Sequence, residues 1–454
     1  MNTVVVLGAS YGGAHAGHLL AAKLPSNWRV ILIDRNTHFN HLYVLPRYAV
    51  IPNHEHKAFI PYKSILHNAS DSPRHLFLHA QVTALHEHSV TLSRSFPEYG
   101  IYGKELKFDY AVYALGSHLP APIDLWGPVG DDASKDIERG TKPGAIDWLR
   151  RYRGKIEKAS NILVVGGGAL GIQYATDIAE VFPSKHVTLL HSRKRLLPRF
   201  DERMHDEILS SMSSMNISTI LGERLDLSWP GKIQVNSKGV TERTVRTLSG
   251  REVKADLIML CTGQTPNTSS LRDLSPDSIV VDGPSKGMIR VNRYLQVSVP
   301  APSTTDSKTH DIDSQLSQLS LEPSPESKEK EEVEGENEVE DDEPKLEAIY
   351  PHIFAIGDAA DAFGAINAGH NAYFQGELAA KNMLKMIESE DPSKVELDRY
   401  APGPPAIKVS LGLTKSLFEF NDVIGKKTDA AEDLDAPLIW KFFGVEPTEE
   451  VMHA

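Results

Sequence analysis

The stretch 161–175, NILVVGGGALGIQYA, constrains the fold more than any other part of the chain, because an apolar run meets three glycines and then a helical pattern. It predicts a buried strand, a tight turn and a helix. In such a turn Gly166 permits the bend, Gly168 lets the backbone approach a pyrophosphate, and Gly171 lets helix and strand pack closely. The positive end of the helix dipole then favours the phosphates. We therefore expect a dinucleotide site in a parallel sheet, the alternative being a glycine-rich turn without a ligand.

The chain opens with a second copy of this arrangement. An apolar run at 3–7 leads into the turn GASYGG and a helical pattern, and the next apolar run ends at Asp34. Ser10 replaces the middle glycine, but its backbone N–H can still face a phosphate. A carboxylate at the end of the second strand is suited to the hydroxyls of an adenosine ribose. These features predict a complete mononucleotide-binding unit, whose glycines are Gly8, Gly12 and Gly13.

The second unit differs from the first at the end of its second strand. An NAD-preferring site carries Asp or Glu there, whereas this chain has His191, Ser192 and Arg193, followed by two more basic residues. With cations present and no carboxylate to repel it, a 2′-phosphate would be favoured. This pattern favours NADPH over NADH, and a solvated basic turn is the alternative.

The length and charge of the chain limit the number of domains and the kinds of partner that we expect. A chain of 454 residues is too long for one core, so two or three domains are expected. The net charge of −13 is concentrated in residues 301–347, which hold 16 acidic and 4 basic residues. The rest is nearly neutral and lacks the basic footprint of a nucleic-acid binder. The polar segment 300–347 predicts a disordered insert. We see no 18-residue apolar run and no leader at the N-terminus, so the expected location is the cytoplasm.

Several isolated residues have competing interpretations. The lone cysteine, Cys261, lies in an apolar run and is expected to be a small buried hydrophobe and not a nucleophile. His41, His54 and His56 show no firm metal-ligand spacing, so they are expected to be solvated loop histidines, and no metal site is predicted. Arg47 follows the first unit closely and is expected either to contact a flavin diphosphate or substrate or to form a surface salt bridge.

Four motifs in a fixed order resemble the pyridine nucleotide-disulfide oxidoreductase-like flavoproteins. They are GASYGG with IDR, YALGS, VVGGGALGIQYA and IFAIGDAAD. Within that family the chain is most similar to the apoptosis-inducing-factor-like and ferroptosis-suppressor-like (AMID-type) branch, which is related to type II NADH dehydrogenases. The resemblance covers nearly the whole chain apart from the acidic insert.

The resemblance implies a site for FAD and a site for NADPH or NADH as co-substrate. Asp358 would accept a hydroxyl of the flavin ribityl chain, beside Gly357 in the same motif, and Gly116 would lie in the YALGS turn. The residues implied to hold FAD are Gly8, Ser10, Gly12, Gly13, Asp34, Arg47, Val82, Gly116, Gly357 and Asp358. Those implied to hold the nicotinamide nucleotide are Gly166, Gly168, Gly171 and Arg193.

Two departures from the family pattern limit the mechanism. Disulfide-reducing members carry a cysteine pair after the first ribose carboxylate, whereas this chain has Asn40, His41, Leu42 and Tyr43. Gln173 replaces the usual glutamate of the second fingerprint helix, which puts a proton-transfer or nicotinamide-ordering role there in doubt. We expect hydride to pass from NAD(P)H to flavin and electrons to pass directly to a quinone-like acceptor or oxygen. The alternatives are a flavin oxidoreductase of one biosynthetic metabolite and a nucleotide-binding signalling protein with little turnover.

The expected fold class is α/β, with an FAD domain, an inserted NAD(P) domain, both Rossmann-like, and a small C-terminal α+β domain. The expected boundaries are 1–125, 126–266, 267–385 and 386–454. Trp440, Phe442 and Phe443 beside Lys441 suggest peripheral contact with a membrane, against the alternative that they pack on the body of the protein. A monomer or a homodimer is expected.

Overall fold

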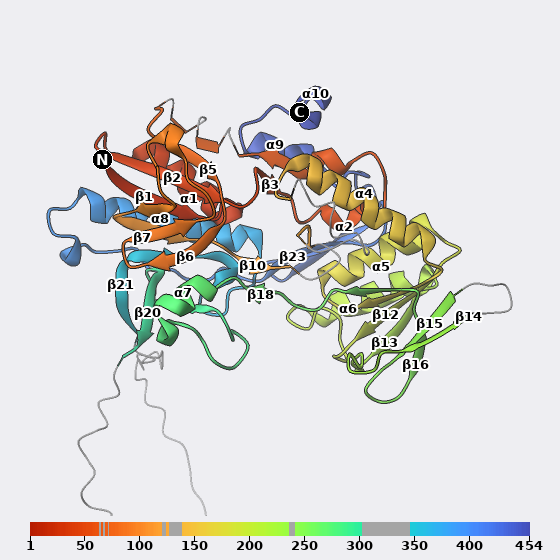
Figure 1. Ribbon diagram of the computed structural model, residues 1–454. Helices are drawn as coiled ribbons and strands as arrows, with labels where there is room; N and C mark the ends of the chain where they lie inside the picture. Colours follow the sequence, from red (N-terminus) through yellow and green to blue (C-terminus); the bar gives the residue numbers. More distant parts are fainter. Residues whose placement is uncertain are drawn as a thin grey trace, which may run out of the picture.

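The computed structural model describes residues 1–62, 65–66, 69–70, 72–119, 124–126, 139–235, 241–301 and 346–454. Most of the expected acidic insert, residues 302–345, lies outside this set. A mostly parallel sheet and a wholly parallel sheet, each flanked by helices, form the two halves of the molecule (Figure 1). The expected α/β class with two Rossmann-like units is confirmed.

The first sheet collects strands from both ends of the chain. Strand β1 (Asn2–Leu7) lies in its middle, paired in parallel with β2 (Trp28–Asp34) and β9 (Tyr110–Tyr113). Helices α1 (Tyr11–Lys23) and α8 (Gly369–Glu388) pack against each other beside this sheet. Residues beyond the second sheet therefore complete the first one. The outer strands are β5 (Leu76–His79), β21 (Leu346–Ala355) and the antiparallel β20 (Gln296–Pro300).

The second sheet is wholly parallel and contains the stretch 161–175. Its order is β13 (Ser218–Leu221), β12 (His186–His191), β11 (Asn161–Val165) and β17 (Leu257–Leu260). Its strand residues are almost continuously apolar because both faces are covered. The helices of this half are α4 (Lys142–Lys158), α5 (Ala169–Val181) and α6 (Glu202–Ser214), and a hairpin sheet follows with β14 (Lys232–Val235), β15 (Thr241–Arg246) and β16 (Glu252–Lys254).

A short ladder links the two halves. Strand β10 (Ser117–His118) pairs antiparallel with β18 (Thr265–Pro266), so the chain leaves and re-enters the first half at adjacent points. The neighbouring strands β5 and β6 belong to different sheets: β5 joins the first sheet, and β6 (Val82–His86) pairs with β7 (Ser89–Leu92) in a separate sheet. The remaining elements here are β8 (Glu105–Lys107), α7 (Ser269–Leu274), β19 (Ile289–Arg290), β22 (Ala360–Asp361) and the 3₁₀ turns Pro97–Tyr99, Pro276–Ser278, Gly357–Ala359 and Pro392–Lys394.

The C-terminal part is a three-stranded sheet followed by two short helices. The sheet packs on α5, while the last helices return to the segment that follows the first unit. Its elements are β23 (Ala406–Ser410), β24 (Ser416–Phe420), β25 (Val423–Lys427), α9 (Pro437–Phe442) and α10 (Glu449–His453). The segment after the first unit holds β3 (His38–Asn40), α2 (Leu45–Tyr48), the 3₁₀ helix η1 (Glu55–Ala58) and β4 (Phe59–Pro61).

Arg47 corrects a sequence-based expectation. Its side chain is fully buried and pairs with the equally buried Asp177 of α5, Nε to Oδ2 at 2.8 Å and Nη2 to Oδ1 at 3.0 Å. The same guanidinium donates to the carbonyl oxygens of Gly412, Leu413 and Glu432. Five hydrogen bonds account for all its donors. Arg47 therefore joins three parts of the chain and has no donor left for a flavin diphosphate, and the pair is not at the surface.

We expect Asp177→Ala to lower the free energy of unfolding by about 3–5 kcal/mol, because it leaves a buried guanidinium without its counter-charge. Urea denaturation of the variant measures this. Glu252→Ala is the matched control, since it breaks the exposed Lys232–Glu252 pair, and exposed pairs contribute only about 0–1 kcal/mol. Equal destabilisation by the two variants would contradict the assignment.

Candidate functional site

The first glycine turn is shaped by backbone contacts that exclude side chains. Gly8 has a φ of +96°, and a Cβ there would overlap the carbonyl oxygen of Ala114. A Cβ on Gly13 would overlap the carbonyl oxygen of Gly8, and one on Gly12 would overlap that of Ala372 in α8. Helix α1 is therefore held against both the turn and α8, as the sequence pattern required.

Asp34 closes this turn from the end of β2. Its Oδ2 accepts the N–H of Ala9 at 2.7 Å, and its Oδ1 accepts the N–H of Asn36 at 2.7 Å. The side chain is only 9% exposed, and burial raises the pKa of the carboxyl, against the lowering effect of the two N–H donors. Each oxygen keeps lone pairs for a further donor, as a ribose hydroxyl would require.

The second turn repeats the first with one difference. Gly166 has a φ of +129° and its missing Cβ would overlap the carbonyl oxygen of Cys261, while a Cβ on Gly171 would overlap that of Gly166. Gly168, in contrast, has no protein atom within 4 Å of an added Cβ. No protein packing within the described residues requires glycine at this position, which fits the close approach of a ligand.

Within the part of the chain that the structure describes, no side chain caps the N-terminal amides of the helices that start at these turns. Ser10 and Gly168 are the N-cap residues of α1 and α5, and neither supplies a side-chain cap. Helices α4 and α6 do have such caps, from Thr141 and Asp201. The amides of α1 and α5 thus remain available to phosphate groups, which helix N-termini bind through their N–H groups and dipole. The residues present fit two dinucleotides.

His191 occupies in the second unit the place of Asp34 in the first. Gly8 donates to the carbonyl of Ile33, and Gly166 donates to that of Leu190, so the two strand ends are in the same register. Just as Ala9 donates to Asp34, the N–H of Gly167 donates to Nδ1 of His191 at 3.1 Å.

The hydrogen bond from Gly167 fixes the tautomer of the neutral His191 ring. Burial lowers the pKa of His191, partly offset by the backbone of Arg195, and because Nδ1 accepts a hydrogen bond, the proton of the neutral ring lies on Nε2. Nε2 is buried and has no hydrogen-bond partner among the described residues. The position therefore offers a donor where Asp34 offers an acceptor. The sequence analysis noted the missing carboxylate but not this replacement, which comparison of the two strand registers would have revealed.

Asp358 connects two of the sequence motifs, YALGS and IFAIGDAAD, through the hydroxyl of Ser117. The hydroxyl of Ser117, in the YALGS turn, lies 3.0 Å from Oδ2 of Asp358 and 2.8 Å from Oε1 of Gln264. Burial raises the pKa of Asp358, partly offset by the bond from Ser117. Gly116 and Gly357 have φ values of +60° and +69°, so glycine relieves backbone strain at both turns. The role of Asp358 stays a prediction, and sequence reasoning indicated neither its partner Ser117 nor the contact of Ser117 with Gln264.

Two other expected positions contribute differently. Val82 begins β6, is half-buried, and packs against the first core, so it shows a structural contact only. Arg193 follows β12 and has an exposed side chain, available to solvent or ligand.

Cys261 is buried, as the sequence predicted, and burial raises the pKa of its thiol.

The segment that replaces the family's cysteines carries unsatisfied polar groups. Asn40 Oδ1, His41 Nδ1 and the Tyr43 hydroxyl are buried without a hydrogen-bond partner among the described residues. Burial lowers the pKa of His41 to about 4, so the ring is neutral at pH 7. Gln173 donates to the carbonyl oxygen of Tyr43 at 3.2 Å and so fixes this segment to α5. Buried polar groups without partners are uncommon and mark this segment as a candidate ligand contact.

The fold and the two glycine turns are those of a protein with two dinucleotide-binding units. The comparison with known proteins gives the same class of protein. Residues 2–301 match the profile of the pyridine nucleotide-disulphide oxidoreductase family, and the chain belongs to that family. Fe-regulated protein 8 of Mycosarcoma maydis is 40% identical over 91% of this chain and 88% of its own length. Apoptosis-inducing factor homolog B of Dictyostelium discoideum is 25% identical over 90% and 87%, and human (Homo sapiens) ferroptosis suppressor protein 1 is 28% identical over 65% and 70%.

Solved structures share the fold. NDH2 of Plasmodium falciparum, in complex with NADH, has a TM-score of 0.63 at 12% identity, covering 99% of this chain and 96% of that one. The sulfide:quinone oxidoreductase of Aquifex aeolicus has a TM-score of 0.62 at 16% identity, covering 99% and 94%. Both similarities concern the fold, and they match the two-domain arrangement found here.

We expect Gly168→Ala to weaken binding of NAD(P)H at least tenfold while lowering the melting temperature only slightly, because alanine is a poorer N-cap than glycine. The added methyl meets no protein atom and the backbone there has an ordinary φ of −87°, so a tenfold loss of affinity would require a ligand close to the backbone. Titration calorimetry and thermal denaturation measure the two effects. Gly154→Ala in α4, which also meets no protein atom, is the control. Unchanged nucleotide affinity in Gly168→Ala would contradict the assignment.

Proposed function

We propose that this protein is an FAD-dependent NAD(P)H oxidoreductase that delivers electrons directly to a quinone-like acceptor, without a redox disulfide. The observation that carries the proposal is the repetition, within one chain, of the same strand, turn and uncapped helix. Bound together, a flavin and a reduced nicotinamide supply hydride transfer, which needs position and no ionising side chain. The proposed hydride transfer therefore requires no acid–base pair.

The chain's own residues would bind and orient the two nucleotides. Asp34 would accept hydroxyl donors of the adenosine ribose of FAD, while the first-turn amides of α1 would face its phosphates. Asp358, oriented by Ser117, would accept a ribityl hydroxyl. The amides of α5 and the open face of Gly168 would receive the phosphates of NAD(P)H. Buried carboxylates keep these contacts short and directional.

The acceptor would receive electrons without a sulfur relay, because the lone cysteine is buried and lies outside the 40–43 segment. The unpartnered groups of Asn40, His41 and Tyr43 are suited to the carbonyl and hydroxyl groups of a quinone or to the flavin itself. Relatives in fold include a sulfide:quinone oxidoreductase, which supports a quinone-like acceptor. Molecular oxygen would be a slow substitute.

Anaerobic mixing with NADPH or NADH tests this function. We expect rapid loss of the flavin absorbance, followed by its return when a soluble quinone is added. Bleaching without recovery across a quinone panel would favour a specific metabolite as acceptor. A flavin-loaded protein that does not bleach would be a nucleotide-binding protein with little turnover, and a protein unable to retain flavin would refute the proposal altogether.

We propose that NADPH is the preferred reductant, since His191 offers a hydrogen-bond donor and Arg193 an exposed cation near the expected 2′-phosphate. We expect Arg193→Ala to raise KM for NADPH about tenfold with little change for NADH, the size of one lost charge-assisted hydrogen bond. His191→Asp should favour NADH, because a carboxylate repels the phosphate and accepts ribose hydroxyls. The ratio of kcat/KM values measures both effects, with Arg203→Ala as control, and an unchanged ratio would refute this assignment.

The C-terminal aromatic residues divide into two groups. Trp440 is fully buried and donates its Nε1–H to the carbonyl oxygen of Lys57 at 2.9 Å, so it packs against the body of the protein. Phe442 and Leu438, also on α9, are 57% and 65% exposed, and Phe374 on α8 is 58% exposed. No described helix is both long and apolar enough to cross a bilayer. We propose that these three exposed side chains contact a membrane surface peripherally.

We expect the wild-type protein to float with phosphatidylcholine–phosphatidylserine vesicles and the Leu438→Glu, Phe442→Glu double variant to remain in the soluble fraction. Charged groups cannot enter the acyl boundary without a large desolvation cost. Tyr102→Glu, at a residue 82% exposed elsewhere, is the control. If the wild-type protein does not float, membrane contact through this patch is excluded.

A further inference from the structure

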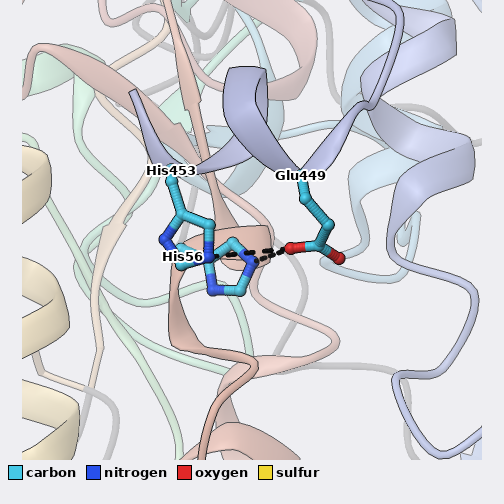
Figure 2. Close-up of side chains that lie close together, drawn as sticks. All are labelled: His56, Glu449 and His453. Atoms are coloured by element: carbon cyan, nitrogen blue, oxygen red, sulfur yellow. Dashed lines mark hydrogen bonds and ion pairs between the residues drawn. The ribbon is translucent and has the colours of Figure 1, made fainter.

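His56 is not a solvated loop histidine, contrary to the sequence-based expectation. It lies in η1, is only 6% exposed, and points toward the C-terminal helix α10 (Figure 2). Two side chains of α10, Glu449 and His453, face it from successive turns. Residues separated by almost 400 positions thus meet at one point.

The ligand atoms of these three side chains converge. Oε2 of Glu449 lies 3.2 Å from Nε2 of His56 and 3.6 Å from Nε2 of His453. All three atoms lie within 4.8 Å of one another. The two imidazole rings are stacked, with centroids 3.7 Å apart and planes inclined by 16°, so their in-plane lone pairs run side by side. The exposed ring of His453 has to turn about its side-chain bonds before both Nε2 atoms face one ion.

We propose that His56, Glu449 and His453 bind a divalent transition-metal ion, with zinc as the best match. Imidazole nitrogen and carboxylate oxygen are typical zinc ligands, at bond lengths of about 2.0–2.2 Å in a tetrahedral arrangement. Ligand atoms at the corners of such a tetrahedron are about 3.4 Å apart. The distances from Oε2 of Glu449 to the two Nε2 atoms, 3.2 Å and 3.6 Å, lie on either side of that value. Because Glu449 and His453 are exposed, water can reach the fourth position.

The surroundings orient the carboxylate. Nζ of Lys57 lies 3.9 Å from the other oxygen of Glu449, Oε1, and 2.9 Å from Oδ2 of Asp433. Lys57 therefore contacts the oxygen of Glu449 that the ion would not use, and Asp433 offsets its charge. Such contacts behind a ligand fix its orientation and increase metal affinity.

The proposed ion would fasten the end of the chain to the first half of the molecule. Helix α10 has only five residues, too few to be stable alone. Met452 of this helix is buried, and its carbonyl oxygen accepts a hydrogen bond from the buried Lys142, the first residue of α4, at 2.6 Å. A metal would add a cross-link between η1 and α10 beside this contact. The role is structural and independent of the proposed electron transfer.

Zinc binding to the metal-stripped, flavin-loaded full chain, with any affinity tag removed, tests the proposal. Competition with a chromophoric chelator should reveal one site per chain in the wild-type protein. His453→Ala and Glu449→Gln should each weaken that site at least tenfold, since each removes one of three protein ligands. His86→Ala, which removes an imidazole on the exposed face of β6, should bind as the wild type does.

Two further measurements guard against misfolding as an explanation. The exposed His453 can be replaced without opening a cavity, and retained flavin absorbance would show that the variant is folded. Zinc should raise the melting temperature of the wild type and of His86→Ala by a few degrees and leave that of His453→Ala unchanged. Cobalt(II) should give the intense visible bands of a tetrahedral site. Absence of stoichiometric binding, or equal binding by His453→Ala, would overturn the proposal and leave a hydrogen-bonded cluster.

Discussion

The structure depends on a close contact between the start of a helix and the glycine turn before it. The two backbones are so close that only glycine, which lacks a Cβ, fits there. Gly13 against the carbonyl of Gly8, and Gly171 against that of Gly166, are the same contact made twice. Each one fixes the first turn of a helix beside the end of a parallel strand. The first-turn amides of α1 and α5, which no described side chain caps, therefore lie at the ends of these strands.

The sequence correctly predicted those features of the fold that depend on only a few neighbouring residues. The two turns, the strand ends and the buried cysteine could be read from glycine spacing and apolar runs, because backbone sterics act over a few residues. Arg47 could not be assigned in this way. Its five partners come from Asp177 and from carbonyl groups more than 360 residues away, and nothing near Arg47 in the sequence indicates them. His56 was misjudged for the same reason, since its partners lie on the last helix.

The aromatic residues near the C-terminus also show that neighbouring positions in the sequence do not reveal which side chains are buried. The sequence places Trp440, Phe442 and Phe443 together, but one helical turn distributes them over different faces. Trp440 fills the core beneath α9, and Phe443 contacts Phe39 with ring centroids 4.7 Å apart, whereas Phe442 is exposed. The sequence alone grouped these three aromatic residues. In the fold only Phe442 is largely exposed, and two further exposed apolar side chains, Leu438 on α9 and Phe374 on α8, were not indicated by the sequence.

His191 shows how a repeated unit can be adapted by one substitution. In both units the residue at the strand end accepts an N–H from the glycine turn, so its position is fixed by the turn and not by the ligand. What varies is the atom presented on the other side. A carboxylate presents an acceptor, which suits ribose hydroxyls; an imidazole fixed through Nδ1 presents a donor, which suits a phosphate oxygen. The same scaffold can therefore hold two different nucleotides in one chain without changing its backbone.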